Sequence, residues 1–234
     1  MRLALALLLL PLSAPAEVVT VFAAASLGPA MAEVSEGFEA QTGHEMRLVL
    51  AASSVLARQI AAGAPADLFL SASVDWAETV EARARVDLAR NTLVLIAAEG
   101  APDTALAELP EALGTGRLAV ALTESVPAGL YARAALETLG LWEALAPRLA
   151  QADNVRGALS FVALGVAPYG IVYGSDVLQE PRVRVLETFP EDSHPPIVYP
   201  ALLLTEGAGA RALFAHLQAP ETRAILAAHG FLPP

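Results

Sequence analysis

Short apolar runs alternate with longer helical patterns along most of the chain, and this alternation is the feature that most constrains the fold. The runs expected to form strands are 18–22, 46–51, 67–72, 93–97, 117–121, 169–173, 183–186 and 200–204. The segments expected to form helices are 27–40, 55–62, 155–164, 208–217 and 220–228, with one more beginning near Pro127. Strands that alternate with helices are typical of β-α units. The pattern therefore predicts an α/β protein with mainly parallel sheets and flanking helices.

Two segments interrupt this alternation. Residues 99–116 are rich in proline, glycine and acidic residues, and residues 190–196 contain three prolines. Proline and glycine are typical of loops, because proline fixes the backbone angle φ and glycine adopts backbone angles that other residues rarely reach. We therefore expect two α/β lobes that are joined by strand crossovers near Leu95 and Pro200.

The first sixteen residues have the composition of a secretory signal. Arg2 is followed by the apolar run 3–12 and then by Ala14-Pro15-Ala16, the small-x-small pattern that precedes signal cleavage. The run is shorter than the roughly 20 residues that a membrane-spanning helix needs. We expect cleavage near Ala16/Glu17. Because the chain has no cysteine for lipid attachment, we expect a periplasmic protein without a lipid anchor or direct membrane insertion.

The net charge of the chain is −11 at pH 7. Such a charge repels nucleic acid and anionic membrane surfaces, and no cluster of lysine and arginine offsets it. If the protein binds an anion, a local arrangement of hydrogen-bond donors must provide the attraction.

No sequence motif indicates an enzyme. Ser175 lies in Tyr-Gly-Ser-Asp, which lacks the glycine spacing of a nucleophile elbow, and the chain offers no cysteine nucleophile. Gly114 and Gly116 precede a strand rather than a helix, unlike the glycines of a phosphate loop. The four histidines, which are His44, His194, His216 and His229, lack the spacing of a helical metal site. We expect neither catalysis nor a bound metal cation or cofactor, and we interpret these histidines as surface or capping residues.

Four strand-to-helix junctions carry small or hydroxyl residues. They are 22–27, 51–55, 125–129 and 153–157. A helix begins with backbone N–H groups that have no partner within the helix, and it carries a partial positive charge there. Several such helix starts directed at one point can hold an anion without a cationic side chain. Ordinary capping explains any single junction equally well, because serine and asparagine are favoured at helix starts.

Six strings in the chain resemble the periplasmic molybdate-binding proteins of ABC transporters, and they occur in the order found in that family. The strings are 21–27 (VFAAASL), 53–69 (SSVLARQIAAGAPADLF), 126–132 (VPAGLYA), 154–159 (NVRGAL), 170–176 (GIVYGSD) and 189–194 (FPEDSH). The resemblance covers almost all of the chain after the expected signal.

The resemblance implies a two-lobed type II periplasmic-binding-protein fold with a ligand cleft between the lobes. Its first lobe would comprise residues 17–94 and 202–234, and its second lobe residues 95–201. The implied ligand is molybdate, with tungstate as a near-isostere, and the implied partner is the membrane permease of an ABC importer. Family positions imply that the anion is held by Ser26, Ser53, Ala128, Val155 and Tyr173. Ser54 is the alternative to Ser53, because relatives often carry a longer run of hydroxyl residues there. We expect a monomer.

Two other functions remain open from the residues alone. One is a binding protein of the same fold for sulfate or phosphate, and the other is an enzyme or regulatory domain on a similar fold. Phosphate can carry a proton and therefore favours a site with an acceptor carboxylate. No acidic residue lies in the strings around Ser26 and Ser53, although Asp153 lies close to Val155. A signal sequence disfavours an intracellular regulator.

Overall fold

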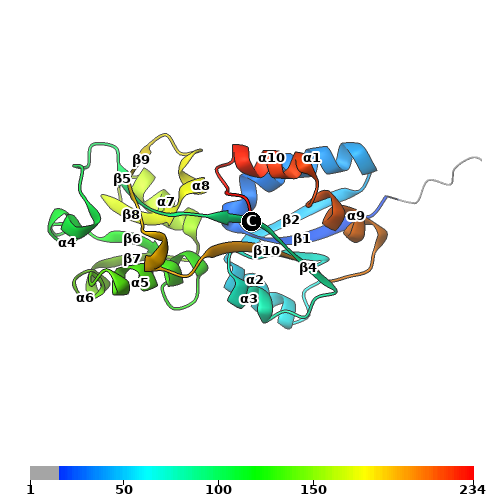
Figure 1. Cartoon of the computed structure of the whole chain (residues 1–234), viewed down its shortest axis with the longest axis horizontal. Helices are drawn as coiled ribbons and strands as arrows, with labels where there is room; N and C mark the ends of the chain where they lie inside the picture. The colour runs from blue at the N-terminus through cyan, green and yellow to red at the C-terminus, as the bar shows by residue number, and fades with distance from the viewer. Residues whose placement is uncertain (1–15) are drawn as a thin grey trace, which may run out of the picture.

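The computed structural model describes residues 16–234, which form two α/β lobes that lie side by side (Figure 1). Residues 1–15, which hold nearly all of the predicted signal sequence, lie outside the described residues. No helix in the described part of the chain is sufficiently long and apolar for a membrane span.

The first lobe is built on a five-stranded sheet in the order β2-β1-β3-β10-β4. Its strands are β1 (Val18–Ala24), β2 (Glu45–Ala51), β3 (Leu68–Leu70), β4 (Ala84–Asn91) and β10 (Ile197–Leu203). Its helices are the 3-10 helix η1 (Ala25–Leu27), α1 (Gly28–Thr42), α2 (Ser53–Ala61), α3 (Val74–Glu78), α9 (Ala208–His216) and α10 (Pro220–Ala228). Helices α1 and α10 cover one face of the sheet, and α2 and α3 cover the other (Figure 1).

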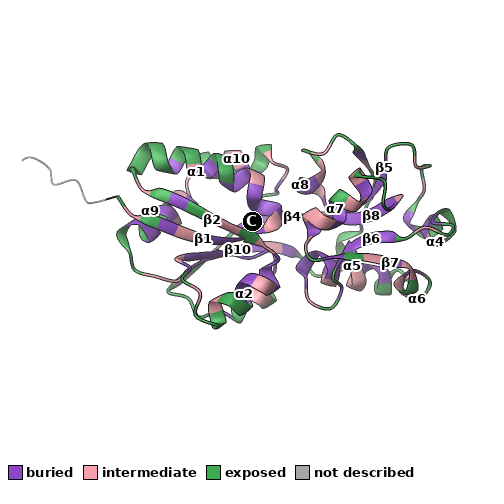
Figure 2. Ribbon diagram, turned by 180° about the vertical axis from the view of Figure 1, so that it is seen from behind, coloured by how far each residue is buried: buried purple, intermediate pink, exposed green. Residues whose placement is uncertain are grey.

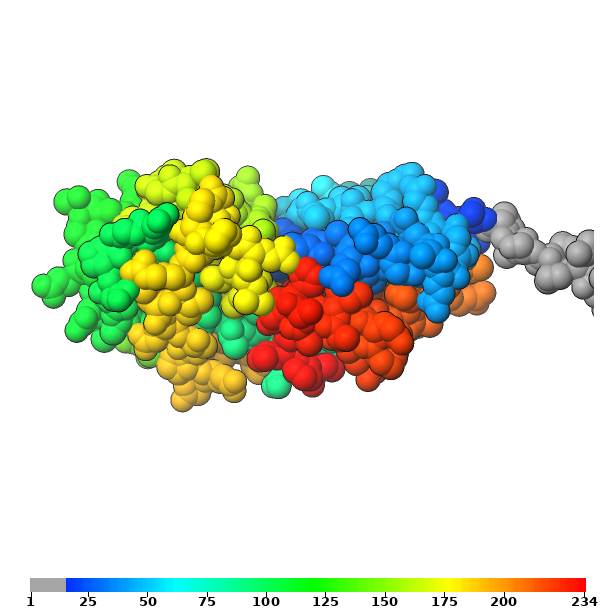
Figure 3. Space-filling view, turned by 90° about the horizontal axis from the view of Figure 1, so that it is seen from above, coloured from blue at the N-terminus to red at the C-terminus, as the bar shows by residue number. Residues whose placement is uncertain are grey.

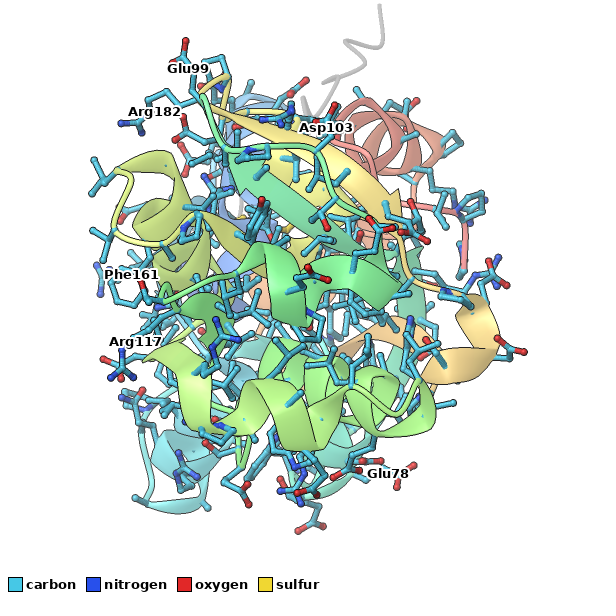
Figure 4. The ribbon with its side chains drawn as sticks, turned by 90° about the vertical axis from the view of Figure 1, so that its left-hand side faces the viewer. Glu78, Glu99, Asp103, Arg117, Phe161 and Arg182 are labelled. Carbon is cyan, nitrogen blue, oxygen red and sulfur yellow. The ribbon has the colours of Figure 1, made fainter. Side chains whose placement is uncertain are left out.

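The second lobe repeats this plan with the strand order β7-β6-β8-β5-β9. Its strands are β5 (Leu93–Ala98), β6 (Leu118–Ala121), β7 (Leu149–Ala152), β8 (Tyr169–Tyr173) and β9 (Val183–Thr188). Its helices are α4 (Leu109–Ala112), α5 (Pro127–Thr138), α6 (Trp142–Leu145), α7 (Val155–Ala163) and α8 (Gly174–Val177), with the 3-10 helices η2 (Leu106–Glu108), η3 (Ala146–Arg148) and η4 (Glu191–Ser193). Charged side chains such as Glu99, Asp103 and Arg182 lie at the periphery of this lobe and point away from it (Figure 4).

Four of the five strands in each sheet run in the same direction. In the first sheet only β10 is reversed, since it pairs antiparallel with both β3 and β4. In the second sheet only β5 is reversed, through antiparallel pairs with β8 and β9. The predicted α/β class with mainly parallel sheets is therefore confirmed. The central strands are buried, whereas the outer faces of the helices are exposed (Figure 2).

The chain changes sheets between Asn91 and Leu93 and returns between Thr188 and Ile197. The predicted lobe boundaries, at residues 94/95 and 201/202, instead fall inside β5 and β10. The division of the chain at those residues stays a prediction.

Two strands were absent from the sequence prediction. Strand β4 alternates exposed and half-buried residues in its first half, because it lies at the edge of its sheet and carries Arg85 and Asp87. Strand β7 is a four-residue edge strand, too short to show a period. One side of an edge strand is open to solvent, so polar residues occur along it and interrupt the apolar pattern that predicts a strand.

Candidate functional site

The carboxyl ends of six parallel strands, three from each lobe, face one another across a small cavity. Strands β1, β2 and β3 lead to it from the first lobe, and β6, β7 and β8 lead to it from the second. The cavity is lined by Ala24, Ala25, Ser26, Ala52, Ser53, Ala72, Val126, Pro127, Ala128, Asn154, Val155 and Tyr173. Ligands of α/β proteins characteristically bind beyond the carboxyl ends of the strands.

All five residues that the family resemblance implied lie in this lining. Ser26 and Ser53 come from the first lobe, and Ala128, Val155 and Tyr173 come from the second. Ser54 is fully buried, but it does not line the cavity. The three-dimensional arrangement thus brings the five residues together and favours Ser53 over Ser54, while their contact with an anion stays a prediction.

Three helices begin at the cavity, and each presents backbone N–H groups there. The first intrahelical bonds of α5 and α7 are donated by Leu130 to the Val126 carbonyl and by Ala158 to the Asn154 carbonyl. The N–H groups of Ala128 and Val155 precede these bonds, so they are free to donate to a ligand. Helix α2 begins in the same way at Ser53. The aligned dipoles of the three helices favour negative charge at this point.

The serine hydroxyls are arranged as donors toward the cavity. Ser53 Oγ accepts a hydrogen bond from the backbone N–H of Ala72 at 2.9 Å. Ser26 Oγ lies 3.0 Å from the hydroxyl of Tyr199. A hydroxyl that already accepts one hydrogen bond has its own hydrogen available for another partner. Both serines are buried, with 1% and 5% exposure for Ser53 and Ser26.

Tyr173 carries a buried polar group that is suited to bind a ligand. Its side chain is 1% exposed, and its hydroxyl has no hydrogen-bond partner among the described residues. A buried hydroxyl without a partner costs free energy, and native proteins rarely keep one without a functional reason. Burial raises the pKa of the Tyr173 hydroxyl well above its ordinary value. The group therefore keeps its proton at neutral pH and can serve as a donor.

The cavity is neutral as well as rich in donors. None of the described residues that line it is charged. The space between the lining atoms amounts to about 220 Å³, including its opening to solvent. The site can surround a small anion with neutral donors, but it offers no side chain that would act as a general base.

The lobes touch across the cavity. Trp76 on α3 donates from its indole nitrogen to the carbonyl of Ser125, and Tyr131 on α5 donates to the carbonyl of Ala72 at 3.4 Å. On the opposite rim Gln179 lies 2.6 Å from His229, where the segment after α8 meets the C-terminal segment (Figure 3). The two lobes are therefore in direct contact in this structure.

The four histidines and the ion pair between Asp176 and Arg156 lie outside the cavity lining. All four histidines are half-buried, and none of them lines the cavity. Asp176 lies behind Tyr173 and is reached by the guanidinium of Arg156 at 3.3 Å. Burial raises the pKa of Asp176 to about 6, and Arg156 lowers it only in part. Arg156 contacts one carboxylate oxygen, and the other has no partner among the described residues.

Comparison with known proteins identifies the family. The model of the bacterial extracellular solute-binding proteins matches residues 19–232. The chain belongs to this family. It is 41% identical to the molybdate-binding protein ModA of Escherichia coli (strain K12), over 91% of this chain and 88% of that protein. It is 40% identical to ModA of Haemophilus influenzae, over 91% of this chain and 89% of that protein.

Solved structures agree with this assignment. The periplasmic molybdate-binding protein of Azotobacter vinelandii superimposes with a TM-score of 0.82 at 25% identity, covering 92% of this chain and 99% of that chain. The resemblance inferred from the six strings is therefore confirmed, and so is the two-lobed fold. The similar proteins are solute-binding components rather than enzymes.

Sequence reasoning missed several residues that complete the site. Trp76, Tyr131, Asn91 and Tyr199 connect the lobes or support the predicted ligand residues. Tyr131 lies inside the string 126–132, but the strings do not include Trp76, Asn91 or Tyr199. A buried tyrosine or asparagine needs a polar partner, but the partner here lies on another element and cannot be read from local sequence.

Proposed function

We propose that this protein is the periplasmic receptor of an ABC importer, that it binds molybdate and tungstate, and that it delivers them to the membrane permease. The observation that carries the proposal is the neutral cavity that is lined by Ser26, Ser53 and Tyr173 and by the helix starts at Ala128 and Val155. We propose that these five residues donate to the anion. The names and ligands of the similar proteins in Escherichia coli and Haemophilus influenzae support the choice of anion.

Neutral donors suit a tetrahedral dianion. Removing a dianion from water is expensive unless its oxygens receive hydrogen bonds, and bonds to a charged acceptor are about twice as strong as those between neutral groups. The partnerless hydroxyl of Tyr173 becomes satisfied when an anion oxygen occupies the cavity. Hydroxyl and backbone donors thereby compensate for the strongly negative charge of the chain.

Size is the basis that we propose for selectivity among dianions. Sulfate has the charge and shape of molybdate but shorter bonds to oxygen, so donors fixed at the distance of molybdate oxygens leave sulfate with long contacts. Tungstate closely matches molybdate in size. Phosphate is disfavoured for a second reason, since none of the described lining residues is a carboxylate that could accept its proton.

Calorimetric titration of the protein without its signal sequence, using molybdate, tungstate, sulfate and phosphate, tests the proposal. We expect one site per monomeric chain for molybdate and tungstate, and much weaker binding of the other two anions. Molybdate at about 100 times its dissociation constant would add roughly 2.7 kcal/mol to the free energy of unfolding. Sulfate binding that is equal to or tighter than molybdate binding would overturn the proposed ligand.

A further inference from the structure

Ser26 is the end of a buried chain of hydrogen bonds that begins at the crossover between the lobes. The hydroxyl of Tyr199 on β10 lies 3.0 Å from Ser26 Oγ. The amide nitrogen of Asn91, at the end of β4, lies 3.2 Å from the same Tyr199 hydroxyl. Tyr199 is fully buried and Asn91 is 6% exposed, so solvent does not compete for these bonds.

The direction of this chain follows from the groups that hold Asn91. Its side-chain oxygen accepts hydrogen bonds from the backbone N–H of Thr92 at 2.9 Å and of Ser175 at 3.3 Å. A backbone N–H can only donate, so these two contacts identify the oxygen end of the amide. The amide nitrogen must then face Tyr199 and Ser175 Oγ, and it can only donate to them.

This orientation determines the remaining hydrogens. Tyr199 accepts from Asn91, and Ser26 Oγ is the other hydrogen-bond partner of its hydroxyl among the described residues, so its single hydrogen is directed to Ser26 Oγ. Ser26 then accepts from Tyr199, and its own hydrogen is left for the cavity that it lines. Burial raises the pKa of Tyr199 well above its ordinary value, so the hydroxyl keeps the proton that it donates.

We propose that Asn91 and Tyr199 are positioning residues that commit the Ser26 hydroxyl to donate to the bound oxyanion. The proposal rests on the anion-binding function above and assigns two further residues to it. Hydrogen bonds that point in one direction polarise each other and strengthen the last bond by about 10–30%. We call this chain of hydrogen bonds, from Asn91 through Tyr199 to Ser26, the relay. It also prevents the Ser26 hydroxyl from rotating between alternative partners.

A double-mutant cycle on molybdate affinity tests this role, because a residue that acts through Ser26 has no effect when the Ser26 hydroxyl is absent. Tyr199→Phe keeps the ring, including its edge contact with Tyr173, and removes only the hydroxyl. We expect it to weaken molybdate binding roughly three- to tenfold. In the Ser26→Ala background we expect the same substitution to change affinity less than about twofold.

Tyr169→Phe is the matched control. Tyr169 is also 1% exposed, and its hydroxyl donates to the carbonyl of Pro102 at 3.0 Å, in the second lobe and outside the cavity lining. Its substitution should lower the melting temperature and leave molybdate affinity unchanged in both backgrounds.

Asn91→Asp gives a second route if Tyr199→Phe folds poorly. A carboxylate oxygen in place of the amide nitrogen accepts the Tyr199 hydrogen, which turns Tyr199 into an acceptor for Ser26 and diverts the Ser26 hydrogen from the cavity. The loss should be larger than that of Tyr199→Phe. In the Ser26→Ala background, the part of the affinity loss that comes from the added negative charge should persist. The part that comes from reversing the hydrogen bond between Tyr199 and Ser26 should disappear.

If Tyr199→Phe reduces molybdate affinity equally in the wild-type and Ser26→Ala backgrounds, or in neither, the relay is wrong even if molybdate binds as proposed. If the wild-type protein prefers another oxyanion, the proposed ligand fails, and the same cycle measured with that anion decides the relay separately. If Ser26→Ala leaves binding unchanged, Ser26 is not a ligand and the relay fails with it.

Discussion

The indole N–H of Trp76 in the first lobe donates a 2.9 Å hydrogen bond to the carbonyl of Ser125 in the second lobe. Helix α3 carries Trp76, and Ser125 lies in the turn just before α5. The bond connects the two lobes, so we expect it to break when they move apart. The guanidinium of Arg58 lies over the ring of Trp76, 5.5 Å from the ring centroid.

Trp76→Phe should therefore weaken ligand binding through the closed state. A hydrogen bond of this kind contributes about 0.5–1.5 kcal/mol, so we expect a loss of roughly two- to tenfold in molybdate affinity, since the closed state is the one that holds the ligand. Calorimetry measures the loss. Trp142→Phe is the control, because Trp142 stacks with Arg133 on the second lobe and lies outside the cavity lining. A loss of equal size in the control would contradict the interlobe explanation.

Tyr173→Phe removes one donor from the cavity and almost no volume. Losing a hydrogen bond to a charged acceptor should cost about 1.5–3 kcal/mol, or roughly ten- to a hundredfold in affinity. Because the hydroxyl has no partner among the described residues, the melting temperature without ligand should stay the same or rise slightly. Unchanged affinity together with a lowered unliganded melting temperature would show that this hydroxyl is structural.

Ser53→Ala and Ser54→Ala should behave in opposite ways. Ser53 lines the cavity, so its substitution should reduce molybdate affinity roughly ten- to a hundredfold. It also leaves the Ala72 N–H without its partner, so we expect a loss of about 1 kcal/mol of stability. Ser54 Oγ is buried and has no partner among the described residues. Ser54→Ala should therefore keep the affinity and keep or raise the stability; the reverse outcome in titration would make Ser54 the ligand.

Gly129→Ala should displace the helix start that carries Ala128. A Cβ atom at Gly129 would collide with the backbone carbonyl oxygens of Leu122 and Ala121. Neither can move away cheaply, so α5 must shift and carry the Ala128 N–H with it. We expect at least about a tenfold loss of affinity, the cost of one hydrogen bond to an anion.

Gly37→Ala is the control for this substitution. Gly37 is exposed within α1, where an added Cβ meets only His216 Nε2 at 3.9 Å. Alanine is the better helix former by about 1 kcal/mol, so this variant should be more stable with unchanged affinity. Normal binding by Gly129→Ala would show that the Ala128 N–H does not contribute.

Asp176 should make stability depend on pH. Burial raises its pKa from 3.8 to about 6, so the folded protein binds this proton more tightly than the unfolded chain. Its contribution to the free energy of unfolding is therefore greatest below about pH 4 and falls as the pH rises to about 6. At ~1.4 kcal/mol per pKa unit, the fall is about 3 kcal/mol.

Asp176→Asn should remove this fall. Relative to wild type, the variant should gain about 3 kcal/mol in the free energy of unfolding between pH 4 and pH 7. Urea denaturation at four pH values in this range measures the difference. Asp103→Asn, at a carboxylate that is 86% exposed, should leave the profile unchanged. Parallel profiles for Asp176→Asn and wild type would contradict the raised pKa.

Local pattern was sufficient for the class of fold, and the family resemblance predicted the residues of the candidate site. Apolar runs such as 93–97 and 169–173 are buried strands, and burial of a strand on both faces leaves a continuous apolar signal. The six family strings predicted five residues that the structure places around one cavity. This was predictable because each of these residues lies in a short string that resembles the family, whereas the helix starts alone are equally well explained by ordinary capping.

Tertiary structure alone decided how these residues are supported and how the lobes meet. Ser26 and Tyr199 are 173 positions apart, and Trp76 and Ser125 are 49 apart. The role of a polar side chain depends on the partner that folding places beside it. A buried hydroxyl that already accepts a hydrogen bond from one group has its own hydrogen available for another. In the proposed relay, the direction of the Ser26 hydroxyl therefore depends on the antiparallel pairing of β4 with β10, where the chain leaves one lobe and returns from the other.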